Sequence, residues 1–172
     1  MAERERPVRL TPWSKDDFWL LERKNTAEMT KFLGGPETAE KLADRQRRYE
    51  AMSAREPAAG RMFRVSLADS GEGVGSIGFW EREWEGEPVY ETGWGILPEF
   101  QGRGLAVAAL AELLSYARTH GSRDTLHAFP GTDHAASNGV CRRAGFECLG
   151  EVAFEYPAGV PHPSHDWRYR LR

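Results

Sequence analysis

A glycine-rich turn is the segment whose residue types and spacing best suit a chemical task. In Gly95–Ala106 a strand-like run stops at Pro98, and Gly102-Arg103-Gly104 then opens directly onto a helical pattern. The first amides of a helix lack internal acceptors and lie at the positive end of the helix dipole, so they attract anions. Glycines let a phosphate approach the backbone closely, and Arg103 adds a cation. The turn therefore predicts a phosphate-binding site.

Other interpretations of this turn stay open on the pattern alone. A Gly-x-Gly turn also serves as a plain connection between a strand and a helix. A Walker-type loop needs Gly-Lys followed by Ser or Thr, which this segment lacks. A dinucleotide fingerprint needs three spaced glycines early in a βαβ unit, whereas two occur here, in the second half of the chain. Neither known phosphate loop fits.

Two blocks of sequence resemble the signature of the GNAT superfamily of N-acetyltransferases. Gln101-Gly102-Arg103-Gly104-Leu105-Ala106 is similar to its Gln/Arg-x-x-Gly-x-Gly/Ala motif, whose amides bind the coenzyme A pyrophosphate. Ser137–Phe146 resembles the Ser-Asn-x-x-Val…Gly-Phe helix that follows the fifth strand in that superfamily. Within it, the chain is most similar to the RimJ/RimL-type group, which acetylates N-termini of ribosomal proteins and has relatives acting on small amines. The resemblance implies acetyl-coenzyme A as co-substrate.

The resemblance also implies where the thioester lies. The fourth and fifth strands splay apart, and the pantetheine arm pairs like an extra strand with Ile96 and Leu97. An N–H near Leu97 would hold the developing oxyanion. Glu91 stands where the resemblance places an acidic residue, and it would take the proton of the amine directly or through a water. The alternative interpretation of Glu91 is an exposed strand carboxylate.

The second block supplies the remaining candidates. Ser137 is the candidate acid for the departing thiolate, because RimL-like proteins carry a serine there; helix capping or packing is its alternative role. His134 stands where the family often has asparagine, and is either a coenzyme donor or a solvated histidine at a helix start. Asn138 is a further coenzyme contact. Cys141 replaces the tyrosine acid of many GNAT enzymes, and we expect it to be a buried small residue.

The connection between two predicted strands carries alternating acids. In an extended chain alternate residues share a face, so Glu81, Glu83, Glu85 and Glu87 would form one acidic strip that attracts a cationic acceptor. The other interpretation is a solvated hairpin tip with its turn at Gly86.

A mixed sheet with helices has to position these residues. Alternation and helical periodicity predict a strand over 8–10, helices over 15–25 and 38–52, and an antiparallel meander over 62–67, 74–80 and 89–97. A helix ended by Gly121, a strand over 125–129, a helix over 135–144 and strands over 146–154 and 167–171 follow. The predicted fold class is α/β (α+β): a mostly antiparallel sheet of six to seven strands with helices on both faces.

Composition limits the function classes. The 172 residues, 40% of them hydrophobic, suffice for a single acetyltransferase domain over 1–172. The net charge of −3 argues against bulk electrostatic binding of nucleic acid. Two cysteines fit a reducing cytosol, and the histidines share no metal-ligand spacing. Met1–Pro7 alternates Glu and Arg, and no apolar run reaches the length of a membrane span, so we expect a cytoplasmic protein.

The expected acceptor is an amine, either a protein N-terminus or a small molecule such as an amino acid, polyamine or antibiotic. No metal, nucleic acid or membrane partner is expected, while a homodimer and the identity of the acceptor are left open by the sequence. A coenzyme A-binding sensor without turnover and a generic phosphate-binding α/β domain are the competing interpretations.

Overall fold

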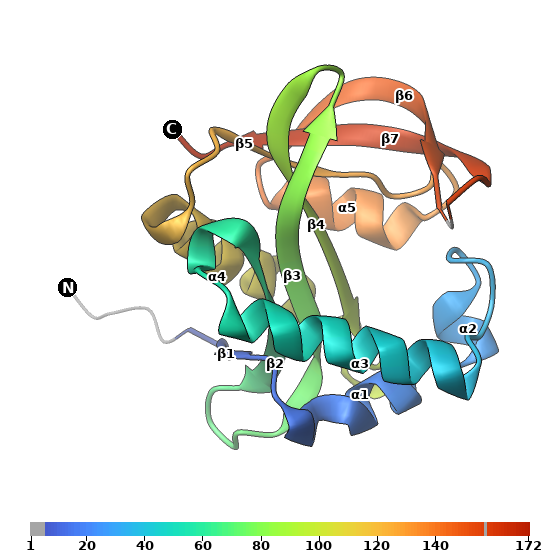
Figure 1. The fold of residues 1–172 in the computed structure, drawn as a ribbon, viewed down its shortest axis with the longest axis vertical. Coiled ribbons are helices and arrows are strands. Elements are labelled where there is room, and N and C mark those ends of the chain that lie inside the picture. Colours follow the sequence, from blue (N-terminus) through green and yellow to red (C-terminus); the bar gives the residue numbers. More distant parts are fainter. Residues whose placement is uncertain (1–5, 157) are drawn as a thin grey trace.

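The strands and helices follow one another largely as the sequence predicts (Figure 1). The computed structural model describes residues 6–156 and 158–172. The first half of the chain contains β1 (Val8–Pro12), α1 (Phe18–Lys24), α2 (Ala27–Thr30), α3 (Ala39–Ala54), β2 (Gly60–Leu67), β3 (Gly73–Trp84) and β4 (Glu87–Ile96). The second half contains α4 (Leu105–His120), β5 (Thr125–Ala128), α5 (Ala135–Arg143), β6 (Glu147–Glu155) and β7 (Pro161–Arg170). Short 3₁₀ helices lie at Lys15–Asp17, Pro57–Ala59 and Pro98–Phe100.

The strands form one seven-stranded mixed sheet in the order β1-β2-β3-β4-β5-β7-β6. Strands β4 and β5 are parallel, and the other neighbouring pairs are antiparallel. A parallel pair needs a crossover, which α4 supplies behind the sheet in Figure 1. This architecture confirms the predicted fold class. The expectation for Met1–Pro7 rests mostly on residues 1–5, which lie outside the described residues.

The boundaries of several predicted elements differ from the structure; β3, for example, continues four residues beyond the expected end at Trp80. The helix expected over 15–25 is a 3₁₀ turn followed by α1, because Thr26 accepts a hydrogen bond from the Met29 amide and begins α2. The strand expected over 167–171 begins six residues earlier, at Pro161. Prolines argue against a strand in a sequence. Pro163 is tolerated because its side of β7 faces away from β6, as the bond from the His165 amide to the Pro130 carbonyl shows.

Helices cover both faces of the sheet. On one face, α4 and α5 bury a large cluster that includes the predicted Leu110, Leu113, Leu114 and Ala117. On the other face, α1 and α3 enclose a smaller cluster built around Trp13, Leu20 and Leu97. Within the described residues, no helix is both long enough and apolar enough to cross a membrane.

Strands β4 and β5 part after a short contact. Among the described residues their pairing is limited to Tyr90↔Leu126 and Glu91↔His127, although β4 continues to Ile96. The predicted splay is therefore present. Since Tyr90 lies in the cluster beneath α4, the alternation of side chains turns Glu91 and His127 toward the face covered by α1 and α3.

Candidate active site

The glycine-rich turn presents bare backbone at the start of α4. Gly102 and Gly104 have φ angles of 78° and 74°. Within the described part of the chain, a Cβ added to either glycine would meet nothing within 4 Å. Gly104 is the N-cap of α4, and no described side chain caps the helix. The first amides of this 16-residue helix therefore face open space, which suits a phosphate.

Side chains of the same segment anchor the turn. The Gln101 amide donates to the Ile96 carbonyl at 2.8 Å and ties the turn to the end of β4. The exposed Arg103 guanidinium lies over the Phe100 ring, 5.5 Å from its centroid. Leu105 is buried and Ala106 half-buried against the core, so they offer backbone amides rather than side chains.

Within the described residues, the edge of β4 that faces the splay has no strand partner beyond Glu91, although the Ile96 carbonyl accepts from Gln101. The Leu97 N–H donates to the Val74 carbonyl at 2.8 Å and is not available to a ligand. Because successive residues of a strand turn their backbone groups to opposite edges, Trp94 and Ile96 face the gap instead. A free N–H near Leu97 therefore has to come from Ile96, which corrects the expectation that both residues pair with pantetheine.

Glu91 lies at the last rung that joins β4 to β5. Its side chain is 13% exposed, and its Oε1 accepts from Arg82 Nη1 at 2.8 Å. Burial raises the pKa of the Glu91 carboxyl, and the Arg82 charge opposes that shift. The interpretation as an exposed strand carboxylate is therefore wrong.

Aromatic rings pack around the Arg82 guanidinium of this ion pair. The Arg82 guanidinium lies 4.5 Å from the Phe154 ring centroid, and the Phe129 and Phe154 rings stack at 4.4 Å. Trp84 lies beside them, 4.7 Å from Phe129. These rings pack against the guanidinium that binds Glu91, whereas the raised pKa of the Glu91 carboxyl comes from the burial of that carboxyl itself.

A buried His–Asp pair beside Glu91 was missed by sequence reasoning. His127 Nδ1 lies 2.6 Å from Asp166 Oδ1, and Trp84 Nε1 donates to Asp166 Oδ2 at 3.1 Å. Both members are almost fully buried. They are 39 residues apart and meet because β7 pairs with β5, and neither residue type nor spacing signals that contact.

Ser137 and His134 contact each other at the start of α5. The Ser137 Oγ is 3.1 Å from His134 Nε2, and the Ser137 amide donates to His134 Nδ1 at 3.4 Å. Burial lowers the pKa of His134, so the ring is neutral near pH 7, although Asp133 opposes the shift. Since Nδ1 accepts, Nε2 carries the ring proton and donates to Oγ. The hydroxyl proton of Ser137 is then free to point elsewhere.

Asn138 and Cys141 lie inside the protein. The Asn138 amide donates to the carbonyls of Gly131 and His134, and its oxygen faces His165 Nδ1 and accepts from Trp167 Nε1, at 2.8 to 2.9 Å. These contacts occupy the side chain that was expected to touch coenzyme A, and they fix α5 against β7. Cys141 is buried, as expected, and burial raises its pKa to about 12. A thiol with that pKa is neither a nucleophile nor an acid at neutral pH.

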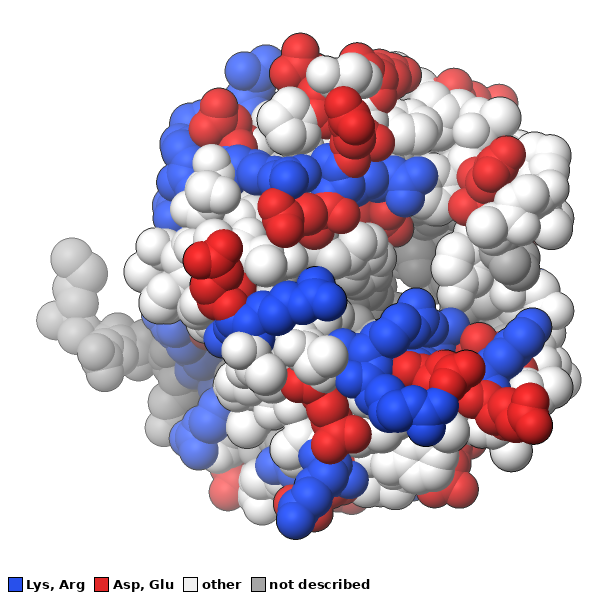
Figure 2. Space-filling model, in the orientation of Figure 1, with Lys and Arg blue, Asp and Glu red and all other residues white. Residues whose placement is uncertain are grey.

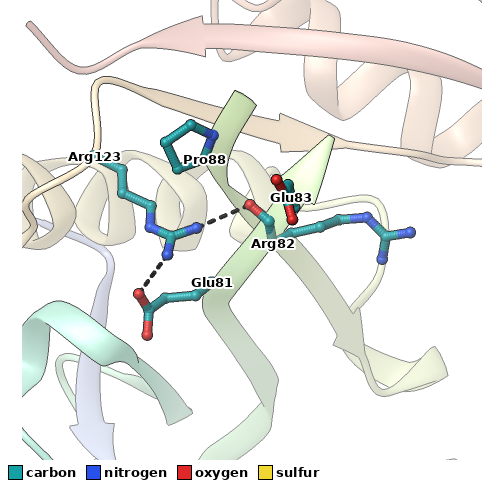
Figure 3. A pocket seen from close by; sticks show the side chains of 5 residues that line it. All are labelled: Glu81, Arg82, Glu83, Pro88 and Arg123. Atoms are coloured by element: carbon teal, nitrogen blue, oxygen red, sulfur yellow. Dashed lines mark hydrogen bonds and ion pairs between the residues drawn. The ribbon is translucent and has the colours of Figure 1, made fainter. Parts of the chain in front are cut away.

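The acidic strip does not face the active site. Glu85 and Gly86 form a tight turn with positive φ angles, which leaves Glu81 and Glu83 together on the face opposite Arg82. Figure 3 shows Glu81 turned toward Arg123, whose guanidinium binds it at 2.6 Å and also donates to the Arg82 carbonyl at 2.9 Å. The structure fits the interpretation of these acids as part of a surface hairpin tip. It does not fit the interpretation in which they form one strip that attracts the acceptor.

The face of the sheet that carries Glu91 is hollowed. Figure 2 shows the hollow between α3 and the end of the sheet formed by β6 and β7, with basic side chains gathered over α3. Two contacts span it: Phe32 stacks on His134 with ring centroids 4.1 Å apart, and Arg45 Nη2 donates to the Tyr156 hydroxyl at 3.4 Å.

Lys24 lies across β4 near the same hollow. Its side chain covers Gly95, where a Cβ would come within 2.7 Å of Lys24 Cε, and its Nζ donates to the Ser76 hydroxyl. Burial lowers the pKa of Lys24 from 10.5 to about 8, and the positive charge of Arg45 adds to the shift.

We expect Lys24→Met to stabilise the protein below pH 8. Because the folded-state pKa is depressed, protonated Lys24 destabilises the folded state fully below about pH 8, and this penalty disappears as pH rises toward 10.5. Because the Lys24 side chain is still partly exposed, solvent reduces the penalty for the protonated form. The gain in free energy of unfolding at pH 7 is therefore about 1–2 kcal/mol. Urea unfolding at pH 7 and pH 10.5, with exposed Lys15→Met as control, measures it. A gain that is equal at both pH values would contradict this assignment.

Comparison with known families and structures agrees with the fold. A family model described as an acetyltransferase (GNAT) domain matches residues 8–147. That match includes β1 through the start of β6, and therefore the splay, the glycine-rich turn and α5. No curated protein sequence matches the chain significantly.

Several solved structures share the fold. A GNAT-family acetyltransferase from Bacillus anthracis aligns with a TM-score of 0.76 at 20% identity, covering 99% of this chain and 97% of that chain. The aminoglycoside acetyltransferase AAC(6')-Ib, solved with coenzyme A, aligns with a TM-score of 0.76 at 20% identity over 95% and 94%. An acetyltransferase from Salmonella typhimurium that modifies the N-terminal serine of ribosomal protein L7/L12 aligns with a TM-score of 0.77 at 19% identity over 96% of both chains.

Proposed function

Because the chain belongs to the GNAT acetyltransferase family, we propose that it transfers the acetyl group of acetyl-coenzyme A to a primary amine by direct attack in a ternary complex. The members of this family are N-acetyltransferases. The observation that supports placing the reaction at this site is the short pairing of β4 with β5. That pairing ends at Glu91↔His127, so a carboxylate stands where backbone donors of β4 become available to a substrate. A generic phosphate-binding domain has no need of this arrangement.

The coenzyme would be held by backbone groups. Phosphates fit the amides at the start of α4, where Gly102 and Gly104 leave the approach open. The pantetheine arm would pair with Trp94 and Ile96, whose backbone groups face the gap. The Ile96 N–H is then in place for the carbonyl oxygen as negative charge develops on it.

Glu91 would act as base for the acceptor. An α-amino group has a pKa of about 8 and a lysine amine about 10.4, so most of either is protonated at neutral pH and cannot attack. The carboxylate attracts the ammonium and takes one proton from it, directly or through a water. The raised pKa of Glu91 brings it closer to that of the amine, which favours the transfer.

Ser137 would protonate the leaving thiolate. Its hydroxyl accepts from His134 Nε2 and so keeps its own proton for another partner. A thiolate with a parent pKa of about 8.5 leaves readily, so this acid matters less than the base.

The acceptor is a protein N-terminus or a small amine. Structures that share this fold include one enzyme that modifies an N-terminal serine and one that modifies aminoglycosides, so the fold serves both. The hollow of Figure 2 is the entrance we propose for either class.

A screen for coenzyme A release tests the function. The protein is incubated with acetyl-coenzyme A and, separately, peptides with free N-termini, amino acid amides, polyamines and aminoglycosides, and the thiol is detected. We expect release that depends on one class of amine, with mass spectrometry showing the acetylated product. Tight coenzyme A binding without release for any amine would support a sensor and reject the transferase.

A further inference from the structure

His127 and Asp166 stand next to the proposed reaction site without a role in the steps above. His127 shares its rung with Glu91, and paired residues of neighbouring strands point to the same face. The charged groups around His127 come from three strands. From β7 come Asp166 and Arg168, the residue that pairs with His127. Glu91 comes from β4, and Arg82, which binds Glu91, comes from β3. The imidazole therefore lies where β4 and β5 part.

The ring is held in one orientation. Asp166 Oδ1 lies 2.6 Å from His127 Nδ1, so the carboxylate accepts the proton carried by that nitrogen. Trp84 holds the second oxygen of Asp166 at 3.1 Å, and the Phe129 ring lies nearly parallel to the imidazole with centroids 5.8 Å apart. In the neutral ring the lone pair then belongs to Nε2. A carboxylate that fixes the tautomer and supports the imidazolium is the arrangement that makes histidine an effective base.

During the transfer the nitrogen of the acceptor loses two protons, and Glu91 is placed to accept one of them. The acceptor ammonium must lose a proton before it attacks, and the nitrogen must lose another once it is bonded to the acetyl carbon. Glu91 already shares Oε1 with Arg82, which stabilises its ionised form. A carboxylate held in this way attracts the ammonium, but it needs a neighbour to take the second proton in the same turnover.

We propose that His127, oriented by Asp166, is the second catalytic base. This role rests on the acetyl transfer proposed above. The neutral amine forms a bond to the carbonyl carbon of the thioester, the carbon–sulfur bond breaks, and the sulfur departs as thiolate. The proton remaining in excess on nitrogen moves to His127 Nε2, and Asp166 stabilises the imidazolium until water carries that proton to Ser137, whose own proton has gone to the thiolate. The proton taken up by Glu91 is the one released to solvent.

The two bases differ in how pH and added imidazole affect their loss. With alaninamide and acetyl-coenzyme A, we expect His127→Ala to lower kcat by about 10²-fold from pH 6 to 10, because a free amine still has a second proton to lose. Imidazole added to this variant should restore activity several-fold. In Glu91→Gln, the loss of kcat should become smaller as pH rises past the pKa of the amine, because the amine is then already neutral. This recovery should occur without added imidazole.

The variant Asp166→Asn tests whether Asp166 acts by orienting His127 or only by stabilising the fold. This variant keeps the size of the side chain but favours the wrong tautomer of His127, so kcat should fall by at least about tenfold while KM and the melting temperature stay near those of the parent. His120→Ala, at the exposed end of α4, is the control and should match the parent.

Three outcomes would overturn the proposal. His127→Ala could keep kcat within threefold of the parent, it could lose activity that imidazole never restores, or Asp166→Asn could be fully active. If the parent itself releases no coenzyme A with any amine of the screen, the transferase assignment fails first, and the two failures are thereby distinguished.

Discussion

Replacing Gly104 by valine is expected to weaken coenzyme A binding by about 100-fold or more. Gly104 has a φ of 74°, and a side chain there would project into the open space in front of the α4 amides. Loss of one or two charge-assisted bonds from amide to phosphate, at about 1.5–3 kcal/mol each, accounts for this factor. Isothermal titration calorimetry with coenzyme A measures it.

Gly71→Val is the matched control for backbone strain. Gly71 also has a φ of 74° with nothing described within 4 Å of an added Cβ, but it lies in the turn between β2 and β3. Both variants should lose similar stability, and only Gly104→Val should lose the ligand. Equal affinity of the Gly104 variant and the parent would show that the phosphates bind elsewhere.

Replacing Glu91 by glutamine should lower turnover by about 10²-fold at pH 7 with little change in coenzyme A affinity. The raised pKa of this carboxyl has a second consequence. The parent should lose activity on acidification at a higher pH than an ordinary carboxyl would require, because the base is protonated sooner. The variant should lack that acidic limb, and steady-state rates from pH 5 to 9 reveal both effects.

Glu81→Gln is the control for the loss of an ion pair. Glu81 lies on the same β3–β4 hairpin as Glu91 but on the opposite face of the sheet, and it binds Arg123 from the connection between α4 and β5, as Glu91 binds Arg82. Its replacement should leave turnover within about twofold. A comparable loss in both variants would trace the effect to the hairpin as a whole rather than to the carboxylate.

Local patterns were enough to predict most of the elements and the glycine-rich turn. The turn depends on residues that are neighbours in sequence, and the helix that follows it has strong periodicity, so both could be read from the chain. The two blocks that resemble the GNAT signature added the splay, which no pattern of β4 or β5 alone contains.

Residues that act from a distance could not be predicted in this way. His127 gains a partner only through β7, whose prolines hide its first half, and the buried amine of Lys24 depends on how α1 crosses β4. The sequence left two interpretations of the hairpin acids open, because alternation shows which side chains lie together, but not which face of the sheet they join. The Leu97 amide was assigned to the ligand for the same reason, since parity alone does not say which edge faces the gap.

The position of β7 in the sheet bears on the order in which the protein is made. This strand is synthesised after β6, yet it is inserted between β5 and β6, and it brings Asp166 to His127 and both His165 and Trp167 to Asn138. A nascent chain that has emerged only as far as β6 already contains the residues of the meander, α4 and the glycine-rich turn. It still lacks the strand that orients the histidine and fixes α5. The coenzyme binding that we propose for the turn would therefore depend on segments made before β7, whereas the proposed catalysis would depend on β7 itself.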